Sequence, residues 1–281
     1  MTHAKNATIS LLGLPYDTNS SYLQGPASAP ERIREAFHCP SSNLSTEFRL
    51  DLGCPDIWRD CGNLAIEALS PHDCFDTILQ EIASLIERNQ KVLSLGGDHS
   101  ISYPAIMAYA QRFPGLNILH IDAHSDLYDT MLDNPFSHAS PFARLMETRL
   151  IKRLVQVGIR TLNPHQKQQA ERFGVEIIDM IKWRSDQSVI FDGPVYLSLD
   201  LDGLDPAFAP GVSHHEPGGL STRDGLNIIH NFDGELIGAD IVELNPHRDI
   251  NNVTAMVAAK FTKEIIARLY FDDTVQWHAP L

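Results

Sequence analysis

Three short segments of the chain contain aspartate, and two of them also histidine, in patterns that are typical of metal binding. Each directly follows an apolar run, and the segments are Gly96–Ser100, Asp122–Asp126 and Asp200–Asp205. Side chains two positions apart point the same way on an extended backbone, so carboxylates and imidazoles can converge within a segment. The candidate ligands are His99, Asp122, His124, Asp126, Asp200 and Asp202.

These ligand types predict two divalent cations rather than a bare acidic cluster. A single Asp-x-His or Asp-x-Asp pair is more often a solvated surface pair, but three such segments at three strand ends favour a binuclear site. Without cations the carboxylates would raise one another's pKa values, at a cost of several kcal/mol. Mostly oxygen ligands with two imidazoles suit Mn²⁺ better than structural Zn²⁺, and Ni²⁺, Co²⁺ and Fe²⁺ are alternatives. Because paired cations lower the pKa of a bound water, we predict a metal-dependent hydrolase.

Alternating strands and helices must position these residues. Short and nearly continuous apolar runs are typical of parallel strands that are covered on both faces. These runs are Ile9–Leu12, Val92–Leu95, Leu116–Ile121, Leu154–Val157, Val175–Ile178, Val195–Leu199 and Leu236–Val242. The clearest helices are Pro71 to about Asn89, with Ser70 as N-cap, and Val253–Tyr270.

This alternation predicts a single three-layer α/β/α domain over residues 1–281, with a central and mainly parallel sheet. Ligands of such sheets bind beyond the carboxyl ends of the strands, where the candidate ligands lie. Thr18–Pro30 and Pro206–Gly219 are rich in Gly, Pro and Ser, and we expect ordered functional loops there.

Composition argues against several classes of function. With 43% hydrophobic and 21% charged residues, the chain is typical of a globular protein with a large core. Its net charge of −14, without a basic stripe, argues against nucleic acid and suits a small cationic substrate. The four cysteines form no C-x-x-C pair, which argues against a zinc ribbon or a redox motif. Without a spanning apolar run or a signal-peptide pattern, we expect a cytoplasmic protein with no membrane partner.

At these same residues the sequence resembles the arginase–agmatinase family of ureohydrolases, over nearly the whole chain. Gly13–Asp17 and Gly25–Arg34 look like the family's N-terminal signature. Residues 96–100, 122–126 and 198–206 match its three metal motifs. The resemblance is closest to the plant-arginase branch in residues 137–140, 142–144, 206–219 and 243–246.

The resemblance implies an arginase-like fold, a homo-oligomer (trimer or hexamer) and an assignment of ligands. The first ion would be held by His99, Asp122, Asp126 and Asp200. The second would be held by Asp122, His124, Asp200 and Asp202, so that Asp122 and Asp200 are shared. Asp98 and Asp205 would orient ligands and loops. His214 and His215 have no matching role in the family, and we do not expect them to bind metal.

The reaction that the resemblance implies is hydrolysis of a guanidinium group to urea and an amine. Hydroxide supplied by two cations would attack the guanidinium carbon, and Asp126 would pass the proton to the departing amine. His138, on the loop after Asp126, is the candidate proton shuttle. Glu243 follows the Leu236–Val242 run, and its carboxylate can pair with the planar guanidinium through two hydrogen bonds.

The substrate depends on the loop between Asp126 and His138. Animal-type arginases have an Asn two residues after this metal motif, where the chain has Tyr128, as agmatinases typically do. The loop contains no Arg or Lys to neutralise a carboxylate. Tyr128 and Asn134, together with His138 and Glu243, are candidate substrate-binding residues. Agmatine, hydrolysed to putrescine and urea, is the preferred substrate.

Several alternatives to agmatine stay open. The first is L-arginine, hydrolysed to L-ornithine and urea, because the plant branch shares the Tyr and the Ser-His-Ala-Ser segment. A guanidino acid such as 4-guanidinobutyrate is the next. A non-catalytic metal-binding relative and a deacetylase-like one-zinc hydrolase are different classes, and the complete ligand set argues against both.

Overall fold

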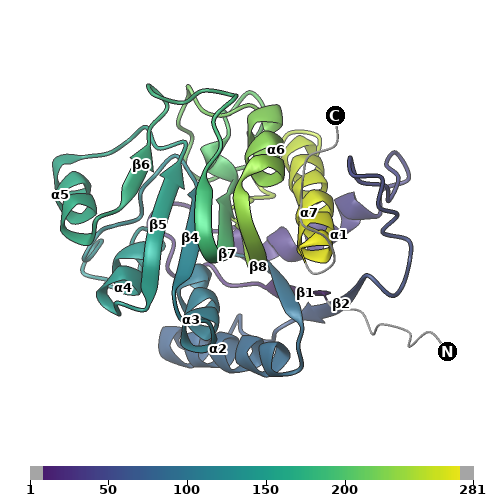
Figure 1. Ribbon diagram of the computed structural model, residues 1–281, viewed down its shortest axis with the longest axis horizontal. Coiled ribbons are helices and arrows are strands. Elements are labelled where there is room, and N and C mark those ends of the chain that lie inside the picture. The colour runs from purple at the N-terminus through teal and green to yellow at the C-terminus, as the bar shows by residue number, and fades with distance from the viewer. Residues whose placement is uncertain (1–8, 273–281) are drawn as a thin grey trace.

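An eight-stranded sheet forms the centre of the molecule (Figure 1). The structure, a computed structural model, describes residues 9–272. Within this range the strand order is β2-β1-β3-β8-β7-β4-β5-β6, and every neighbouring pair is parallel. The strands are β1 (Ile9–Leu14), β2 (Trp58–Asn63), β3 (Lys91–Gly96), β4 (Leu116–Ile121), β5 (Ile151–Val157), β6 (Glu176–Ile178), β7 (Ile190–Asp200) and β8 (Asp233–Val242). The predicted parallel sheet is confirmed.

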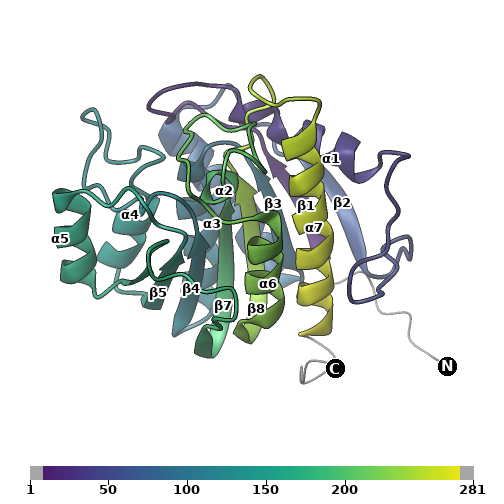
Figure 2. The same ribbon diagram turned by 90° about the horizontal axis from the view of Figure 1, so that it is seen from above.

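Helices cover both faces of this sheet and complete the predicted three layers (Figures 1 and 2). They are α1 (Ala29–Phe37), α2 (Pro71–Glu87), α3 (Ser102–Arg112), α4 (Pro141–Glu147), α5 (Pro164–Phe173), α6 (Thr222–Asn231) and α7 (Val253–Phe271). One hydrophobic core lies under α1, α6 and α7, and includes Ile33 and Ile265. A second lies under α2 and α3, and includes Ile78 and Ile106. Burial on both faces explains why the central strands are so apolar.

The start of α2 shows how local sequence sets a boundary. Ser70 is the N-cap, and its hydroxyl accepts a hydrogen bond from the backbone N–H of Asp73 at 3.2 Å. Pro71 occupies the first helical position, where a missing N–H costs nothing. This helix and α7 match their predictions to within a few residues. The loop predicted to reach Pro30 is shorter, because α1 already begins at Ala29.

Two differences from the predicted strands have physical causes. β2 was not predicted: it is an edge strand that pairs only with β1, and its side chains are mostly exposed, so it needs no apolar pattern. β7 begins at Ile190, five residues before the predicted run. Its register with β8 shifts between Ile190 and Pro194, and such an irregularity tolerates proline in a central strand.

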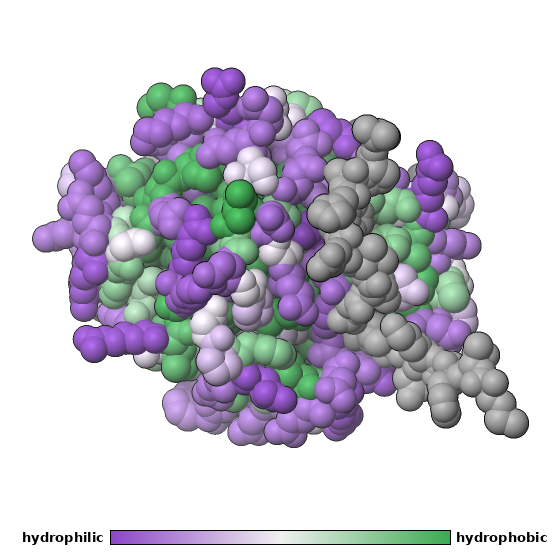
Figure 3. Space-filling view, in the orientation of Figure 1, coloured by the Kyte–Doolittle hydropathy of each residue, from purple (hydrophilic) through white to green (hydrophobic). Residues whose placement is uncertain are grey.

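The outer surface is mainly hydrophilic on the face shown in Figure 3, with scattered apolar side chains. Ile181 and Leu132 are the most exposed large apolar residues among those that the structure describes, at 96% and 77%. Within residues 9–272, no helix has both the length and the apolar character needed to cross a bilayer.

Candidate metal centre

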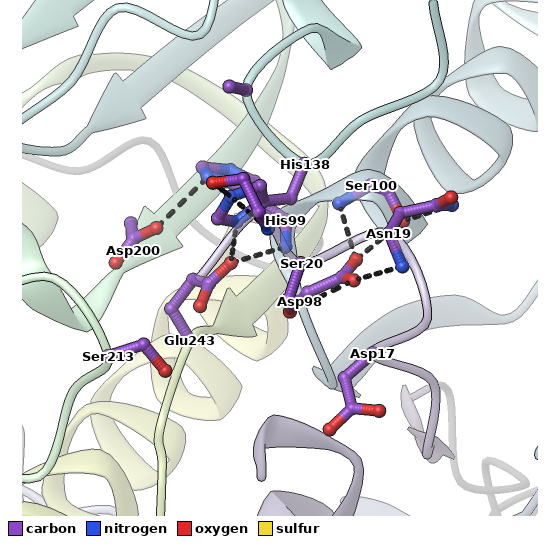
Figure 4. Close-up of polar contacts among 12 residues, drawn as sticks. Asp17, Asn19, Ser20, Asp98, His99, Ser100, His138, Asp200, Ser213 and Glu243 are labelled. Carbon is purple, nitrogen blue, oxygen red and sulfur yellow. Dashed lines mark hydrogen bonds and ion pairs between the residues drawn. The ribbon is translucent and has the colours of Figure 1, made fainter. Parts of the chain in front are cut away.

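Four adjacent strands carry the predicted site residues at their carboxyl ends. In the sheet β3, β8, β7 and β4 are neighbours. His99 follows β3, Glu243 follows β8, Asp200 ends β7 and Asp122 follows β4. Figure 4 shows His99, Asp200 and Glu243 turned toward one another from three of these strand ends. The sheet therefore brings together residues that are far apart in the sequence.

The turn after β3 positions His99 by close backbone packing. A Cβ atom on Gly97 would lie only 1.8 Å from the backbone oxygen of Tyr16, so glycine is required beside the end of β1. Asp98 is fully buried, and its Oδ2 accepts a hydrogen bond from the backbone N–H of Asn19 at 3.0 Å. Burial raises the pKa of Asp98 to about 7. Asp98 thus ties the turn to the loop after β1, a placement that fits the orienting role expected of it.

The first ligand cluster surrounds one nitrogen of His99. Its Nδ1 lies 3.2 Å from Asp122 Oδ2, 3.1 Å from Asp126 Oδ2 and 3.1 Å from Asp200 Oδ2. The imidazole is 1% exposed, and Nδ1 has no hydrogen-bond partner within the described residues. An unpaired buried nitrogen that faces three carboxylate oxygens is the arrangement expected around a cation.

The other nitrogen of His99 is held by a hydrogen-bonded chain. Its Nε2 lies 3.0 Å from the hydroxyl oxygen of Ser198, and this hydroxyl donates to Oδ1 of Asp240 at 2.7 Å. The Ser198 oxygen must therefore accept the proton on Nε2, which leaves Nδ1 free to bind metal. A metal-binding histidine typically has such a partner on its second nitrogen.

The second ligand cluster surrounds His124 and shares Asp122 with the first. Nδ1 of His124 lies 3.2 Å from Asp202 Oδ2 and 3.4 Å from Asp122 Oδ1. Asp122 therefore presents one oxygen to each cluster. Asp200, the other predicted shared ligand, faces His99 through Oδ2, and its Oδ1 accepts the backbone N–H of Asp202 at 2.8 Å.

The charges buried in these clusters fit two divalent cations. Burial, reinforced by repulsion from Asp202 and Asp122, raises the pKa of Asp200 well above its usual value. Burial also raises the pKa of Asp202 to about 6, although the nearby His124 opposes the rise. A cation in each cluster would remove this repulsion, and oxygen ligands with one imidazole per cluster are a suitable donor set. The residues present therefore fit a binuclear metal centre.

Metal binding at the second cluster is expected to weaken as the pH falls below about 6. Below this value Asp202 carries a proton that a cation must displace, whereas above it the carboxylate is free. Calorimetric titration with Mn²⁺ at about pH 5.5 and about pH 7.5 should show weaker binding and greater proton release at the lower pH. Equal affinity at both values would contradict this protonation scheme.

A cavity of about 190 Å³ opens beside the metal ligands. His138 and Glu243 line it, and Nδ1 of His138 lies 2.8 Å from Oε1 of Glu243. Burial opposes protonation of His138, but the Glu243 charge raises its pKa to about 9. The same Glu243 oxygen accepts the backbone N–H of His99 at 3.0 Å. A buried carboxylate and an imidazole thus face the cavity from the side of β8 and the loop after β4.

Backbone strain and one unpredicted contact help to hold these groups. Asp126 and Glu243 both have positive φ angles, 49° and 66°, which are uncommon outside glycine and are often found at functional sites. The sequence did not predict Ser21, whose hydroxyl oxygen lies 2.8 Å from Nε2 of His138 and whose backbone nitrogen lies 3.1 Å from it. Asn19, also missed, accepts the backbone N–H of His138 through its carbonyl oxygen. Their only sequence signal was the polar loop from Thr18 to Pro30.

Comparison with known proteins identifies the family. The model of the Arginase family matches residues 7–267. "Arginase 1, mitochondrial" of Arabidopsis thaliana is 46% identical over 280 positions, which cover 94% of this chain and 81% of that protein. The chain belongs to the arginase family. A solved arginase from Medicago truncatula superposes with a TM-score of 0.89 at 42% identity, covering 94% of this chain and 87% of that one.

Membership in the arginase family confirms the predicted class of enzyme. An agmatinase from Blochmanniella floridana is 33% identical, over 91% of this chain and 86% of that protein, so more than one kind of ureohydrolase is similar. The chain is a ureohydrolase, a hydrolase of linear amidine C–N bonds. Enzymes of the arginase family use a binuclear metal centre and act on small guanidino substrates, and the two clusters can hold such a centre.

Of the four predicted substrate-binding residues in this arginase-family protein, Glu243, His138 and Tyr128 line the cavity and Asn134 does not. The ring of Tyr128 stacks on that of His165, and its hydroxyl oxygen accepts a hydrogen bond from the amide of Asn163. The side chain of Asn134 instead donates to the side-chain oxygen of Asn19 at 3.0 Å. Asn134 therefore joins two loops, and its role in substrate binding stays a prediction.

His214 and His215 have different surroundings. The ring of His214 lines the cavity, with its centroid 5.3 Å from that of His138 and 5.9 Å from that of His124. Burial lowers the pKa of His214, which favours the neutral ring. His215 is exposed, and its Nε2 contacts the backbone oxygen of Pro210 at 2.7 Å. Neither belongs to the metal-ligand clusters of the described residues.

Proposed function

We propose that the chain hydrolyses L-arginine to L-ornithine and urea at a centre of two Mn²⁺ ions. The observation that carries this proposal is its similarity to curated plant arginases, which are 43–46% identical over 94% of the chain. The agmatinase is 33% identical, and a human guanidino acid hydrolase is 31% identical. This difference favours arginine over the agmatine that Tyr128 and the loop composition predicted.

The cavity offers neutral hydrogen-bonding groups for the carboxylate that distinguishes arginine from agmatine. Tyr128 and Gln166 line it, and a phenol and an amide can each donate a hydrogen bond. Because the phenol oxygen of Tyr128 accepts a hydrogen bond from Asn163, its own proton can be donated to a ligand. A few well-placed neutral donors can orient a charged ligand group without a basic side chain. The lack of Arg and Lys in the loop therefore does not exclude arginine.

The other lining residues suit the guanidinium end. A pair of divalent cations lowers the pKa of water and so supplies hydroxide at neutral pH. Glu243 accepts two guanidinium N–H groups and orients the carbon to be attacked. Asp126, which lies both in the first cluster and at the cavity wall, takes the proton released on attack and gives it to the departing amine. His138 exchanges protons between the cavity and solvent.

A urea assay on metal-loaded protein tests the substrate. L-Arginine, agmatine and 4-guanidinobutyrate are compared after loading with Mn²⁺ and, separately, with Ni²⁺, Co²⁺ or Fe²⁺. We expect kcat/KM for L-arginine to exceed that for agmatine by at least about 100-fold, because a site that hydrogen-bonds a substrate group rejects an analogue that lacks it. 4-Guanidinobutyrate keeps a carboxylate but lacks the α-amino group, so its kcat/KM shows whether the amino group is also recognised. A higher kcat/KM for agmatine than for L-arginine would make agmatine the proposed substrate. No urea from any substrate, with metal bound, would remove the proposed activity.

The cytoplasmic location and the trimer or hexamer remain predictions. The predicted location depended partly on residues 1–8, which lie outside the described part of the chain. Several of the similar plant proteins are named mitochondrial, so fractionation of cells that express the chain is the direct test. Light scattering on the purified protein would give the number of subunits.

A further inference from the structure

Two buried polar side chains, His120 and Gln156, adjoin the metal centre but are not among the residues that line its cavity. They are register partners on the neighbouring strands β4 and β5, and both are 0% exposed. His120 precedes Asp122 by two positions, so the imidazole and the carboxylate lie on the same side of the strand. Burying such polar groups is costly unless they are hydrogen-bonded, and their partners show what they do.

Gln156 determines which nitrogen of His120 carries the proton. The amide nitrogen of Gln156 lies 2.6 Å from the backbone oxygen of Ser125 and 2.9 Å from Nδ1 of His120. A carbonyl oxygen can only accept, so the group that faces it must be NH₂, and the second hydrogen of this group is donated to Nδ1. The proton of the ring is therefore on Nε2, which lies 2.7 Å from Oδ2 of Asp122 and donates to it. Burial lowers the pKa of His120, in agreement with a neutral ring.

This arrangement persists although it leaves one acceptor unpaired. Oε1 of Gln156 is buried and has no hydrogen-bond partner within the described residues, a defect that costs about 1–3 kcal/mol. Turning the amide over would place Oε1 against the Ser125 oxygen, where two acceptors would repel. Both nitrogens of His120 are engaged, so this residue is not itself a metal ligand, even though its ring lies within the first cluster.

The hydrogen bond from His120 completes the surroundings of the shared carboxylate. Oδ1 of Asp122 faces His124 and accepts the backbone N–H of that residue at 2.6 Å. Oδ2 faces His99 and accepts from His120. Each oxygen thus receives one hydrogen bond and keeps electron density for one cation.

We propose that His120 and Gln156 are positioning residues of the metal centre: Gln156 fixes His120 as an Nε2–H donor, and His120 orients the Asp122 oxygen that serves the first cation. The proposal rests on the binuclear centre of the proposed function. It predicts unequal effects on the two cations, because His120 touches only Oδ2. Loss of an outer hydrogen-bond partner typically weakens metal binding 10- to 100-fold.

The test measures the two Mn²⁺ dissociation constants by chelator competition on stripped and reloaded protein. His120→Leu should raise one dissociation constant by about 10- to 100-fold and the other by much less. His120→Gln keeps an N–H donor and should recover most of the lost affinity. Gln156→Leu removes the hydrogen bond that keeps the ring proton of His120 on Nε2, and it should raise the same dissociation constant. The matched control is Asn117→Leu on the same strand. Its buried amide donates to the backbone oxygens of Asp192 and Pro194, so this variant should lower Tm and leave both constants unchanged.

A second measurement is independent of metal binding and of the fate of His120→Leu. Nitrogen-15 spectra of histidine-labelled, metal-free protein should show the His120 proton on Nε2, with the signal identified by its loss in His120→Gln. A proton on Nδ1 would overturn the proposal. Mn²⁺ dissociation constants equal to those of the wild type in folded His120→Leu would also overturn it. If His120→Leu does not fold, the same result in Gln156→Leu would overturn it. In those cases the wild-type chain still binds two ions and the proposed function stands. A wild-type chain that binds no Mn²⁺ would overturn both.

Discussion

Replacing Asp122 with asparagine is expected to reduce urea production by about 1,000-fold or more while the chain stays folded. Asp122 is fully buried, and its two oxygens are divided between the clusters of His99 and His124. An amide has a single oxygen and no charge, so both clusters lose a shared anionic ligand. Metal ions in such centres lower the barrier by several kcal/mol, and each loss of about 1.4 kcal/mol slows the reaction tenfold.

Elemental analysis and the urea assay, made on the same samples, check this result. Asp249→Asn is the control, because Asp249 accepts the backbone N–H groups of Thr254 and Ala255 in the first turn of α7 and contacts neither cluster. It should lower Tm and leave two bound ions with normal kcat. If Asp122→Asn kept two tightly bound ions and normal kcat, Asp122 would not be a shared ligand.

The metal ligands could be predicted from the sequence because parallel strands end at one edge of a sheet. His99, Asp122 and Asp200 each come at or shortly after the end of an apolar run, and the runs themselves indicated buried parallel strands. The order of the strands could not be predicted in the same way. β3 and β4 follow each other in the chain, but β8 and β7 lie between them. That order brings Glu243, from the end of β8, against His99.

Contacts that depend on strand register or on the path of a loop could not be predicted from sequence patterns. Gln156 contacts His120 because β4 and β5 pair in one register, and a shift of one residue would turn its side chain away. Ser21 and Asn19 contact the His138 segment across more than a hundred positions of sequence. Nothing in local composition indicates such pairs, and only the polarity of the loop from Thr18 to Pro30 was visible.

The substrate was the least predictable feature, because one residue supported two interpretations. Tyr128 suggested agmatine when it was considered as a replacement for a carboxylate-binding Asn. In the structure its hydroxyl oxygen accepts from Asn163, which leaves the phenol proton for a ligand acceptor. Whether Tyr128 binds a carboxylate thus depends on a hydrogen bond from Asn163, the N-cap residue of α5, and the sequence alone gave no reason to pair these two residues.

Replacing Glu243 with glutamine is expected to lower kcat/KM for the guanidino substrate by roughly 150- to 5,000-fold while both metal ions stay bound. The substitution keeps the shape of the side chain and an oxygen that can accept the backbone N–H of His99. It removes the charge that faces His138 and the cavity. A buried guanidinium cation without its counter-charge costs about 3–5 kcal/mol, which corresponds to this range in kcat/KM. Steady-state kinetics with metal content measured on the same samples give both values.

Glu264→Gln is the matched control for this experiment. Glu264 is also a fully buried carboxylate paired with a histidine, His230, but it lies on α7 away from the residues that line the cavity. This variant should lose stability and keep its kcat/KM. Normal kinetics of Glu243→Gln on L-arginine, agmatine and 4-guanidinobutyrate would remove Glu243 from the substrate site. Equal losses in the two variants would point to general destabilisation. A rise in KM with unchanged kcat would place the Glu243 contact in substrate binding. Equal decreases in kcat and kcat/KM would show that the charge acts on the transition state.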